Sequence, residues 1–461
     1  MIVTLLFLAT AALINAESST RYDYKEALRL SILFYDAQRS GRLPADNPIP
    51  WRGDSAVDDG DAGHDLSGGW YDAGDHVKFG LPMAWASWVL NYGLVAFPDA
   101  YEATGQTAMA CDSVRWPLEY FLKCWIPSEN KFYAQVGDGN SDHSFWGSPE
   151  NMRMSRPASA VTTSCPGSDV AGKTVSALAS GYLVFKDTCG DASFAADLLS
   201  AAESLYAFAK NNKGLYDDCM AAGDFYSSSS YQDELAAAAA WMAKATGESS
   251  YLSDARSFYP NGTAWGFNWN DDNVGAAVVL YDVTGEDFFK NDVVNFVSSY
   301  SSGRVQKTPC GLSYRDKWGP NRHAANAAFI ATLAASLGLN ANEANEYAQS
   351  QINYILGDNP LGISYEIGFG NYFPKKPHHR GSSCRMSDNS CSINDSGDNP
   401  NQLDGGMVGG PGDADDYSDD RDDYVHNEVA VDYNAGFQSA LAGLIHFAIT
   451  DSLPAAPAPG C

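Results

Sequence analysis

The sequence predicts an all-α fold of about twelve helices joined by long loops. Apolar residues recur with the 3.6-residue period of an amphipathic helix in segment after segment, whereas the two-residue alternation of strands is sparse. Although 461 residues would suit two or three domains, no Pro-, Ser- or Thr-rich linker divides them. One large helical domain is therefore favoured.

Each expected helix has one apolar face, and the first of these helices is YKEALRLSILFYDAQRSG at 24–41. Later helices such as 231–246 and 323–338 are rich in alanine and glycine, which suits close helix–helix contact. In chain order the twelve are expected at 24–41, 83–97, 112–126, 170–186, 196–212, 231–246, 249–258, 273–285, 292–303, 323–338, 342–357 and 427–449.

Three stretches between these helices, 42–80, 126–167 and 357–427, are long and rich in Gly, Asp, Pro and aromatic residues. Loops longer than about 15 residues are uncommon in compact domains and usually carry function. We therefore expect the functional face to be built from these loops.

Residues 1–16, MIVTLLFLATAALINA, form an apolar stretch that is short for a membrane span and ends in small residues. We interpret it as a signal peptide cleaved after Ala16, with a buried first helix as the alternative, and expect one domain over 17–461. No later segment is long and apolar enough to cross a bilayer, so a secreted protein with no membrane partner is expected.

Nine cysteines fit an oxidising compartment, and no CxxC pair indicates a structural zinc site. Cys384 and Cys391 bracket a short polar loop and are the easiest pair to propose. The odd count leaves one thiol over, and the terminal Cys461 is the natural candidate. A net charge of −28 argues against nucleic acid as a partner, because both would be anionic.

The stretch GGWYDAGDHVKFG at 68–80 places Asp72 and Asp75 three residues apart among glycines and aromatics. A tight turn there could aim both carboxylates at one point, although two close like charges disfavour joint ionisation. An Asx turn or a helix N-cap is the structural alternative. Aromatic faces that exclude water while offering a flat surface favour a ligand site instead.

A second acidic region, DADDYSDDRDDYVHNEVAVDYNAGF, spans 413–437. Most of its aspartates suit a solvated loop. Glu428 differs, because it lies where the loop becomes the apolar last helix. Partly apolar surroundings raise a carboxyl pKa and suit a general acid.

A Pro-flanked loop, GNYFPKKPHHRGSSC, carries His378, His379 and Arg380, expected as hydrogen-bond donors at mildly acidic pH. A metal site is the alternative, but adjacent histidines rarely converge on one ion and no HExxH accompanies them. Trp and Tyr also recur in loops beside Asn, Asp, Arg and His, a combination that suits sugars, which stack a C–H face and offer hydroxyls to polar groups.

Taken together, these segments resemble glycoside hydrolase family 9, the inverting β-1,4-glucanases, from about Tyr24 to the last helix. The most specific matches are WYDAGDHVKFG and the spaced set Tyr417-x-Asp419, Tyr424, Glu428, Ala430, Asn434-Ala435. HSFWGSPE, YQDELAAAAAW, WGPNRHAANAAF and PHHRGSS follow in the family's order, although Tyr372 stands where the family usually has Asn, Lys or Arg. Without a visible carbohydrate-binding module, the chain is most similar to the invertebrate digestive branch.

The resemblance implies an (α/α)6 barrel whose long loops form an open substrate cleft. It implies that Asp75 is the general base, that Asp72 helps hold the water, and that Glu428 is the general acid supported by Asp419. His378 and Arg380 would bind the sugar at the cleavage point. Further cleft residues would be His143, Trp146, Trp318, Arg322 and Tyr424.

The family also implies structural Ca²⁺, with no cofactor for catalysis. The matching residues form an oxygen-only set suited to that ion: Ser229, Ser230, Asp233, Glu234 and Asp271.

We therefore expect a secreted, monomeric endo-β-1,4-glucanase that hydrolyses cellulose and related glucans with inversion. The alternatives are a β-glucan-binding protein that has lost catalysis, a hydrolase of another β-glucan such as lichenan or xylan, and a calcium-dependent polyanion lyase. The −28 charge and the lack of a basic cleft disfavour the lyase.

Overall fold

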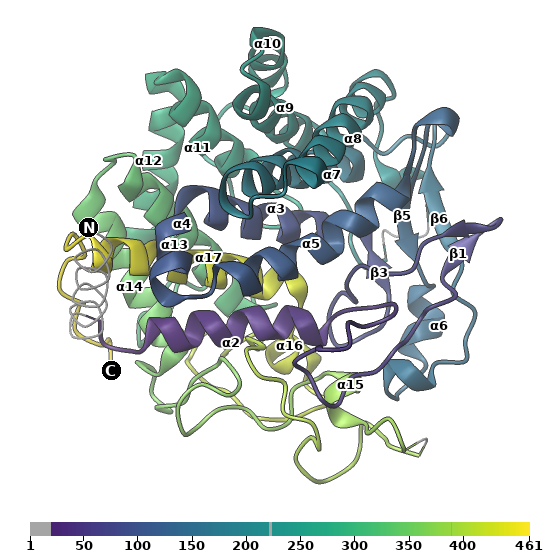
Figure 1. Ribbon diagram of the computed structural model, residues 1–461. Helices are drawn as coiled ribbons and strands as arrows, with labels where there is room; N and C mark the ends of the chain where they lie inside the picture. Colours follow the sequence, from purple (N-terminus) through teal and green to yellow (C-terminus); the bar gives the residue numbers. More distant parts are fainter. Residues whose placement is uncertain (1–19, 221–223, 389) are drawn as a thin grey trace, which may run out of the picture.

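The computed structural model describes residues 20–220, 224–388 and 390–461, and helices dominate them (Figure 1). The predicted signal peptide at 1–16 lies outside the described residues. Within the described part of the chain, no helix has the length and apolar character needed to span a membrane.

Six helices form a closed inner ring. Each contacts the next in chain order, and the last contacts the first. Most of their residues are buried all round, as expected for helices at the centre of a large domain. They are α3 (Gly80–Ala96), α7 (Ser168–Leu183), α9 (Gln232–Thr246), α11 (Asn273–Thr284), α13 (Pro320–Ser336) and α17 (Val431–Ile449).

Six further helices cover this ring from outside (Figure 1). They are α2 (Tyr24–Ala37) on α17, α5 (Thr107–Cys124) on α3 and α7, α8 (Ala192–Asn211) on α7, α10 (Ser249–Phe258) on α9, α12 (Asp287–Ser301) on α11 and α14 (Ala341–Leu356) on α13. The predicted all-α barrel of six helix pairs is thereby confirmed.

Small residues allow the inner helices to approach closely. A Cβ atom on Gly436 of α17 would lie 2.0 Å from the Asn326 side chain on α13, and one on Gly443 would lie 2.6 Å from Thr332. Such distances are far below van der Waals contact, so glycine is required where these two helices pack.

Short helices and strands interrupt the long connections. They are α4 (Pro98–Thr104), α6 (Gly139–His143), α15 (Arg380–Ser383), α16 (Tyr424–Asn427), the 3₁₀ turns η1 (Pro127–Glu129), η2 (Pro149–Asn151) and η4 (Tyr216–Asp218), and the π-helical turn η3 (Val184–Thr188). Strands β1 (Gly60–Asp61) and β2 (His64–Asp65) form a hairpin.

A small antiparallel sheet, which the sequence did not predict, lies beside the barrel (Figure 1). Its order is β3 (Lys78–Phe79), β5 (Lys131–Val136), β4 (Trp125–Ile126), with β6 (Ala158–Val161) also pairing β5. Strands of two to six residues give too little periodicity to stand out from a loop. The pair Lys78↔Val136 fixes the end of the 68–80 stretch against this sheet.

Four disulfides cross-link the described residues: Cys111–Cys189, Cys165–Cys219, Cys310–Cys461 and Cys384–Cys391. The predicted Cys384–Cys391 pair is confirmed. The prediction that Cys461 is the unpaired thiol is wrong, because the C-terminal segment folds back with Gly460 against the Cys310 backbone. The free thiol is Cys124, buried at the end of α5.

Candidate active site

A cleft of about 1310 Å³ opens at one end of the barrel, where loops precede the inner helices α3, α9, α11, α13 and α17. Of the predicted site residues, Asp419 and Glu234 do not line it. Those that line it are Asp72, Asp75, His143, Trp146, Ser229, Ser230, Asp233, Asp271, Trp318, Arg322, His378, Arg380, Tyr424 and Glu428.

The turn that carries Asp72 and Asp75 is joined by its backbone to two distant segments. The Asp72 carbonyl accepts from Val431 N at the start of α17, and the Gly74 carbonyl accepts from Arg380 N at 3.0 Å. A Cβ atom on Gly74 would lie 2.1 Å from the His378 carbonyl oxygen. Glycine is therefore required here, because the 378–380 backbone passes directly over the turn.

Asp75 is held as an anion. Its carboxylate accepts from the amides of Ala73 and Val77 at 3.2 and 3.3 Å, and His143 Nε2 lies 3.5 Å away. Burial alone would raise its pKa, but the His143 contact and the positive charge of Arg380 outweigh burial and lower the pKa below the usual value. An ionised carboxylate facing a cleft can act as a base.

Asp72 has the opposite character. Tyr226 donates a 2.5 Å hydrogen bond to Oδ2, while Oδ1 is buried with no partner among the described residues. Burial and the neighbouring Asp75 charge raise the Asp72 pKa well above its usual value. In this pair ionisation is therefore favoured at Asp75 and protonation at Asp72.

Glu428 lies in extended backbone between α16 and α17, so the last helix begins at Val431 rather than at the predicted residue 427. The Gly74 amide donates to its carboxylate. Burial, together with the negative charges of Asp75 and Asp432, raises the Glu428 pKa to about 8. This side chain is therefore protonated at neutral pH and can act as an acid.

His378 was predicted to be a donor rather than an acceptor at mildly acidic pH, whereas its ring has one donor and one acceptor. Burial lowers its pKa to about 4, so the ring is neutral, and Nδ1–H donates to the Arg421 carbonyl at 2.8 Å. Nε2 is consequently an acceptor. Its backbone also bridges to the acid segment, since His378 N donates to the Asn427 carbonyl.

His379 faces away from this chemistry. It contacts Gln38 through Nε2 and accepts from Ser382 N through Nδ1, so it supports the loop. Arg380 donates to the buried Asp142 at 3.0 Å and lies 5.4 Å from the Trp146 ring. The loop thus presents one neutral imidazole and one guanidinium to the cleft.

Asp419 lies outside the cleft and supports the acid segment. Its carboxylate accepts from the Lys375 and Lys376 amides at 2.6 and 3.0 Å and from the Asn427 side chain at 3.0 Å. Because Asn427 precedes Glu428, these bonds join the histidine-bearing loop to the acid.

Aromatic faces line the cleft on both sides of these groups. The Trp318 and Tyr424 rings lie 5.5 Å apart and are 41% and 49% exposed. Trp146 packs its edge on His378 at 5.0 Å. Arg322 lines the same wall, but its guanidinium is bound to the buried Asp432 at 2.8 Å and to the Trp318 carbonyl.

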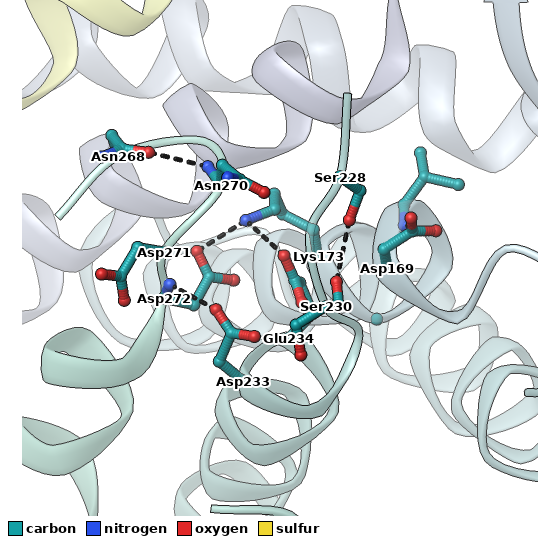
Figure 2. A network of polar contacts seen from close by, with 12 residues as sticks. Asp169, Lys173, Ser228, Ser230, Asp233, Glu234, Asn268, Asn270, Asp271 and Asp272 are labelled. Atoms are coloured by element: carbon teal, nitrogen blue, oxygen red, sulfur yellow. Dashed lines mark hydrogen bonds and ion pairs between the residues drawn. The ribbon is translucent and has the colours of Figure 1, made fainter. Parts of the chain in front are cut away.

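Four of the residues predicted to hold calcium lie in one polar network at the start of α9 and α11 (Figure 2): Ser230, Asp233, Glu234 and Asp271. The fifth, Ser229, is exposed and donates to the Asn270 side chain. Glu234 is fully buried, and neither carboxylate oxygen accepts a hydrogen bond within the described residues. Lys173 lies 3.4 Å from Glu234 and 2.6 Å from Asp272. Unsatisfied buried carboxylate oxygens fit a hard cation.

The remaining predicted ligands are already partnered. Asp233 accepts from Asp272 N, and Asp271 accepts from the amides of Gly266 and Asn273. Among the described acids, histidines and cysteines, one group of three brings its donor atoms within 4.8 Å: Asp75, Asp142 and His143. It belongs to the base side of the cleft, and it includes none of the predicted calcium ligands.

Sequence reasoning missed three residues that the structure places beside the predicted ones. Tyr226 donates to Asp72, Asp142 binds Arg380, and Asp432 binds Arg322 behind Glu428. Asp432 follows Glu428 by four residues and Asp142 precedes His143, so proximity along the chain could have suggested both. Nothing local marks Tyr226, because only the fold brings its loop to the turn.

A family model described as glycosyl hydrolase family 9 matches residues 24–441. Endoglucanase A of Bacillus pumilus is 44% identical over 443 residues, which is 92% of this chain and 66% of that protein. Endoglucanase B of Cellulomonas fimi is 43% identical over 452 residues, which is 94% of this chain and 43% of that protein. The chain therefore spans less than two thirds of the length of these two curated relatives.

Solved structures resemble the whole barrel. An endoglucanase from the termite Nasutitermes takasagoensis has a TM-score of 0.89 and 48% identity, covering 93% of this chain and 100% of that chain. The cellulase Cel9M of C. cellulolyticum, in complex with cellobiose, has a TM-score of 0.86 and 37% identity, covering 92% and 99%.

Proposed function

This chain belongs to glycosyl hydrolase family 9, and we propose that it is an endo-β-1,4-glucanase that hydrolyses internal bonds of cellulose and related glucans with inversion. The relatives named above are endoglucanases and a cellulase, which supports this activity. The observation that carries the mechanism is the opposite shift of two carboxyl pKa values in one cleft, lowered at Asp75 and raised to about 8 at Glu428.

The proposed reaction is a single displacement. Asp75 takes a proton from a water that Asp72 helps to hold, and the water oxygen bonds to C1 of the sugar. Glu428 gives its proton to the glycosidic oxygen as the C1–O bond breaks. Inversion requires about 6.5–9.5 Å between base and acid, so that the water fits between Asp75 and the sugar.

The environments of the two carboxyls support these roles between acidic and neutral pH. Asp75 is ionised above its lowered pKa, and Glu428 stays protonated up to a pH of about 8. An acid and a base of the same residue class need such separation to act in one step.

Substrate binding is proposed for the exposed rings and for the groups around the cleavage point. Trp318, Tyr424 and Trp146 offer faces to sugar C–H groups, while His378 Nε2 and Arg380 can bind hydroxyls. A neutral glucan is indifferent to the −28 charge, which would repel a polyanion or nucleic acid.

We also propose that Ca²⁺ is held by Ser229, Ser230, Asp233, Glu234 and Asp271 and supports the loop before α9. A divalent cation would satisfy the Glu234 oxygens, which accept no hydrogen bond within the described residues, and would offset the repulsion between neighbouring carboxylates. Chelation with EGTA should lower the unfolding temperature, and added Ca²⁺ should restore it. Glu234→Gln should abolish this difference.

The disulfides and the predicted signal peptide support a secreted protein, and we propose that it acts as a monomer. Secretion is checked by sequencing the mature N-terminus, and the oligomeric state by light scattering.

The test of the activity is proton NMR of fresh products from cellopentaose. Inversion predicts that the new reducing end appears first as the α-anomer, and internal cleavage predicts cellobiose and cellotriose. A β-anomer at early times would contradict the mechanism. Binding without any reducing-end release would favour the non-catalytic alternative, and faster cleavage of lichenan would move the preference to mixed-linkage glucan.

A further inference from the structure

We propose that Tyr216 is a positioning residue for the reaction, acting through Tyr226 to fix the hydrogen bond that Asp72 receives. This inference rests on the proposed glucanase activity. Tyr216 does not line the cleft, and no sequence motif pointed to it.

The catalytic end of the connection is Tyr226. Its hydroxyl donates to Asp72 Oδ2 at 2.5 Å, and its ring packs at 5.1 Å from Phe79 and 5.0 Å from Trp269. Among the described residues this hydroxyl is the side-chain donor to Asp72, whose other oxygen has no partner. The direction of the Asp72 carboxyl therefore depends on where Tyr226 is held.

Tyr216 holds the Tyr226 backbone. The Tyr216 hydroxyl donates to the Tyr226 carbonyl, and within the described residues no other donor reaches that oxygen. Without this donor the part-buried Tyr226 carbonyl would have no partner among the described residues, which favours a shift of the Tyr226 backbone toward another donor.

The other end of Tyr216 is anchored to the inner ring. Its amide donates to both oxygens of Asp169 at 3.2 and 3.1 Å, and Asp169 is fully buried in the first turn of α7. Tyr216 itself is 2% exposed. A rigid barrel helix is thus connected, through two tyrosines, to a carboxyl that faces the cleft.

Two further ties restrict the same segment. Cys219 is bonded to Cys165, and the Asp217 carboxylate accepts from Ser227 and Ser228. These bonds limit how far residues 216–219 and 226–228 can rearrange, but none of them contacts the Tyr226 carbonyl or hydroxyl. Among the described residues, the Tyr216 hydroxyl is the donor that reaches the Tyr226 carbonyl itself.

The first experiment compares Tyr216→Phe with a matched control on cellopentaose. Tyr206→Phe also removes a buried hydroxyl, bonded to Asp254 at 3.0 Å between α8 and α10, away from the cleft. We expect Tyr216→Phe to lower kcat about fivefold to tenfold with KM within about twofold of wild type, because transition-state geometry changes while the sugar contacts remain. Tyr206→Phe should keep both constants.

The second experiment asks whether the effect passes through Tyr226. In a Tyr226→Phe background, where the donor to Asp72 is already absent, adding Tyr216→Phe should leave kcat unchanged. A fall in kcat equal to that seen in the wild-type background would overturn the proposal. A Tyr216→Phe enzyme with wild-type kcat would also overturn it, because ring packing alone would then hold Tyr226 in place.

Thermal unfolding curves and kinetics measured well below both transition temperatures separate folding from positioning. A wild-type protein that does not cleave cellopentaose would refute the proposed function itself. An active wild type with an unaffected Tyr216→Phe variant would refute this inference alone.

Discussion

The base side and the acid side of the cleft use carboxyls for opposite tasks, with Asp75 buried and Glu428 partly exposed. Asp75 has two backbone amides, His143 and the Arg380 charge around it, and its pKa falls. Desolvation and the charges of Asp75 and Asp432 raise the Glu428 pKa to about 8, outweighing Arg380 and the Gly74 amide. Desolvation raises the pKa of both carboxyls, and it is outweighed only at Asp75, so the donors and positive charge around Asp75 decide which carboxyl is the base.

The two sides also differ in how they are built. The base is on a turn that needs glycine because the backbone of residues 378–380 crosses it. The acid is on extended backbone just before a barrel helix. The Gly74 peptide joins them, since its amide donates to Glu428 and its carbonyl accepts from Arg380 N. Four sets of substitutions test how the two sides differ and how they are connected, and they are given from the largest expected effect to the smallest.

The largest effect is expected from removing either group. Asp75→Asn and Glu428→Gln should each lower kcat on cellopentaose by about 10²- to 10⁴-fold, the usual contribution of general acid–base catalysis. The two variants should then behave differently on a dinitrophenyl β-cellobioside, because its leaving group departs without needing a proton. On this substrate the kcat of Glu428→Gln should stay within about tenfold of the wild-type value, while the kcat of Asp75→Asn should remain strongly lowered.

Equal impairment of both variants on the activated substrate would remove Glu428 from the role of acid. Far-ultraviolet circular dichroism and the unfolding temperature serve as controls, because both substitutions nearly preserve side-chain volume.

The second substitution changes Gly74, whose peptide lies between the base and the acid. Gly74→Ala places a Cβ atom 2.1 Å from the His378 carbonyl oxygen, and a backbone atom cannot yield as a flexible side chain can. We expect loss of stability on the order of 2 kcal/mol or more and a large loss of kcat. Gly397→Ala, where no atom lies within 4 Å of the added Cβ, is the matched control. Equal unfolding temperatures would contradict the close approach.

The barrel was predictable because long amphipathic segments carry a strong periodic signal. All twelve expected ranges contain a helix, while the strands of the small sheet, such as β3 with two residues, were too short to detect. The partner of Cys461 was not predictable, because it depends on the C-terminal segment returning to Cys310.

The acids themselves could be named from their sequence surroundings, but their environments could not. The neutral state of His378 depends on burial, and the donor to Asp72 comes from Tyr226, which is 154 residues away in the chain. Such contacts exist only once the barrel brings the loops before its inner helices to one place. The predicted catalytic roles stay predictions until the variants are measured.

The third change raises the pKa of the base. His143 contributes a contact and charge that lower the Asp75 pKa, so His143→Ala should move the acidic limb of the kcat/KM profile to higher pH, by up to about one unit. The alkaline limb should stay in place. His426→Ala, which removes a histidine bonded to Asp423 outside the cleft, should leave both limbs unchanged. An unmoved acidic limb would exclude His143 from tuning the base.

The smallest effect is expected from a charge behind the acid. Asp432 raises the Glu428 pKa, and its carboxylate also neutralises Arg322 at 2.8 Å. Asp432→Asn removes a negative charge and leaves a positive one, and both changes favour the ionised form of Glu428. The alkaline limb of kcat/KM, set near pH 8 by Glu428, should therefore shift to lower pH by less than about one unit. Asp99→Asn at the far end of α17, where Asp99 contacts His446, is the control and should not move it. An unmoved limb, or a shift to higher pH, would mean that the Asp432 charge does not raise the Glu428 pKa.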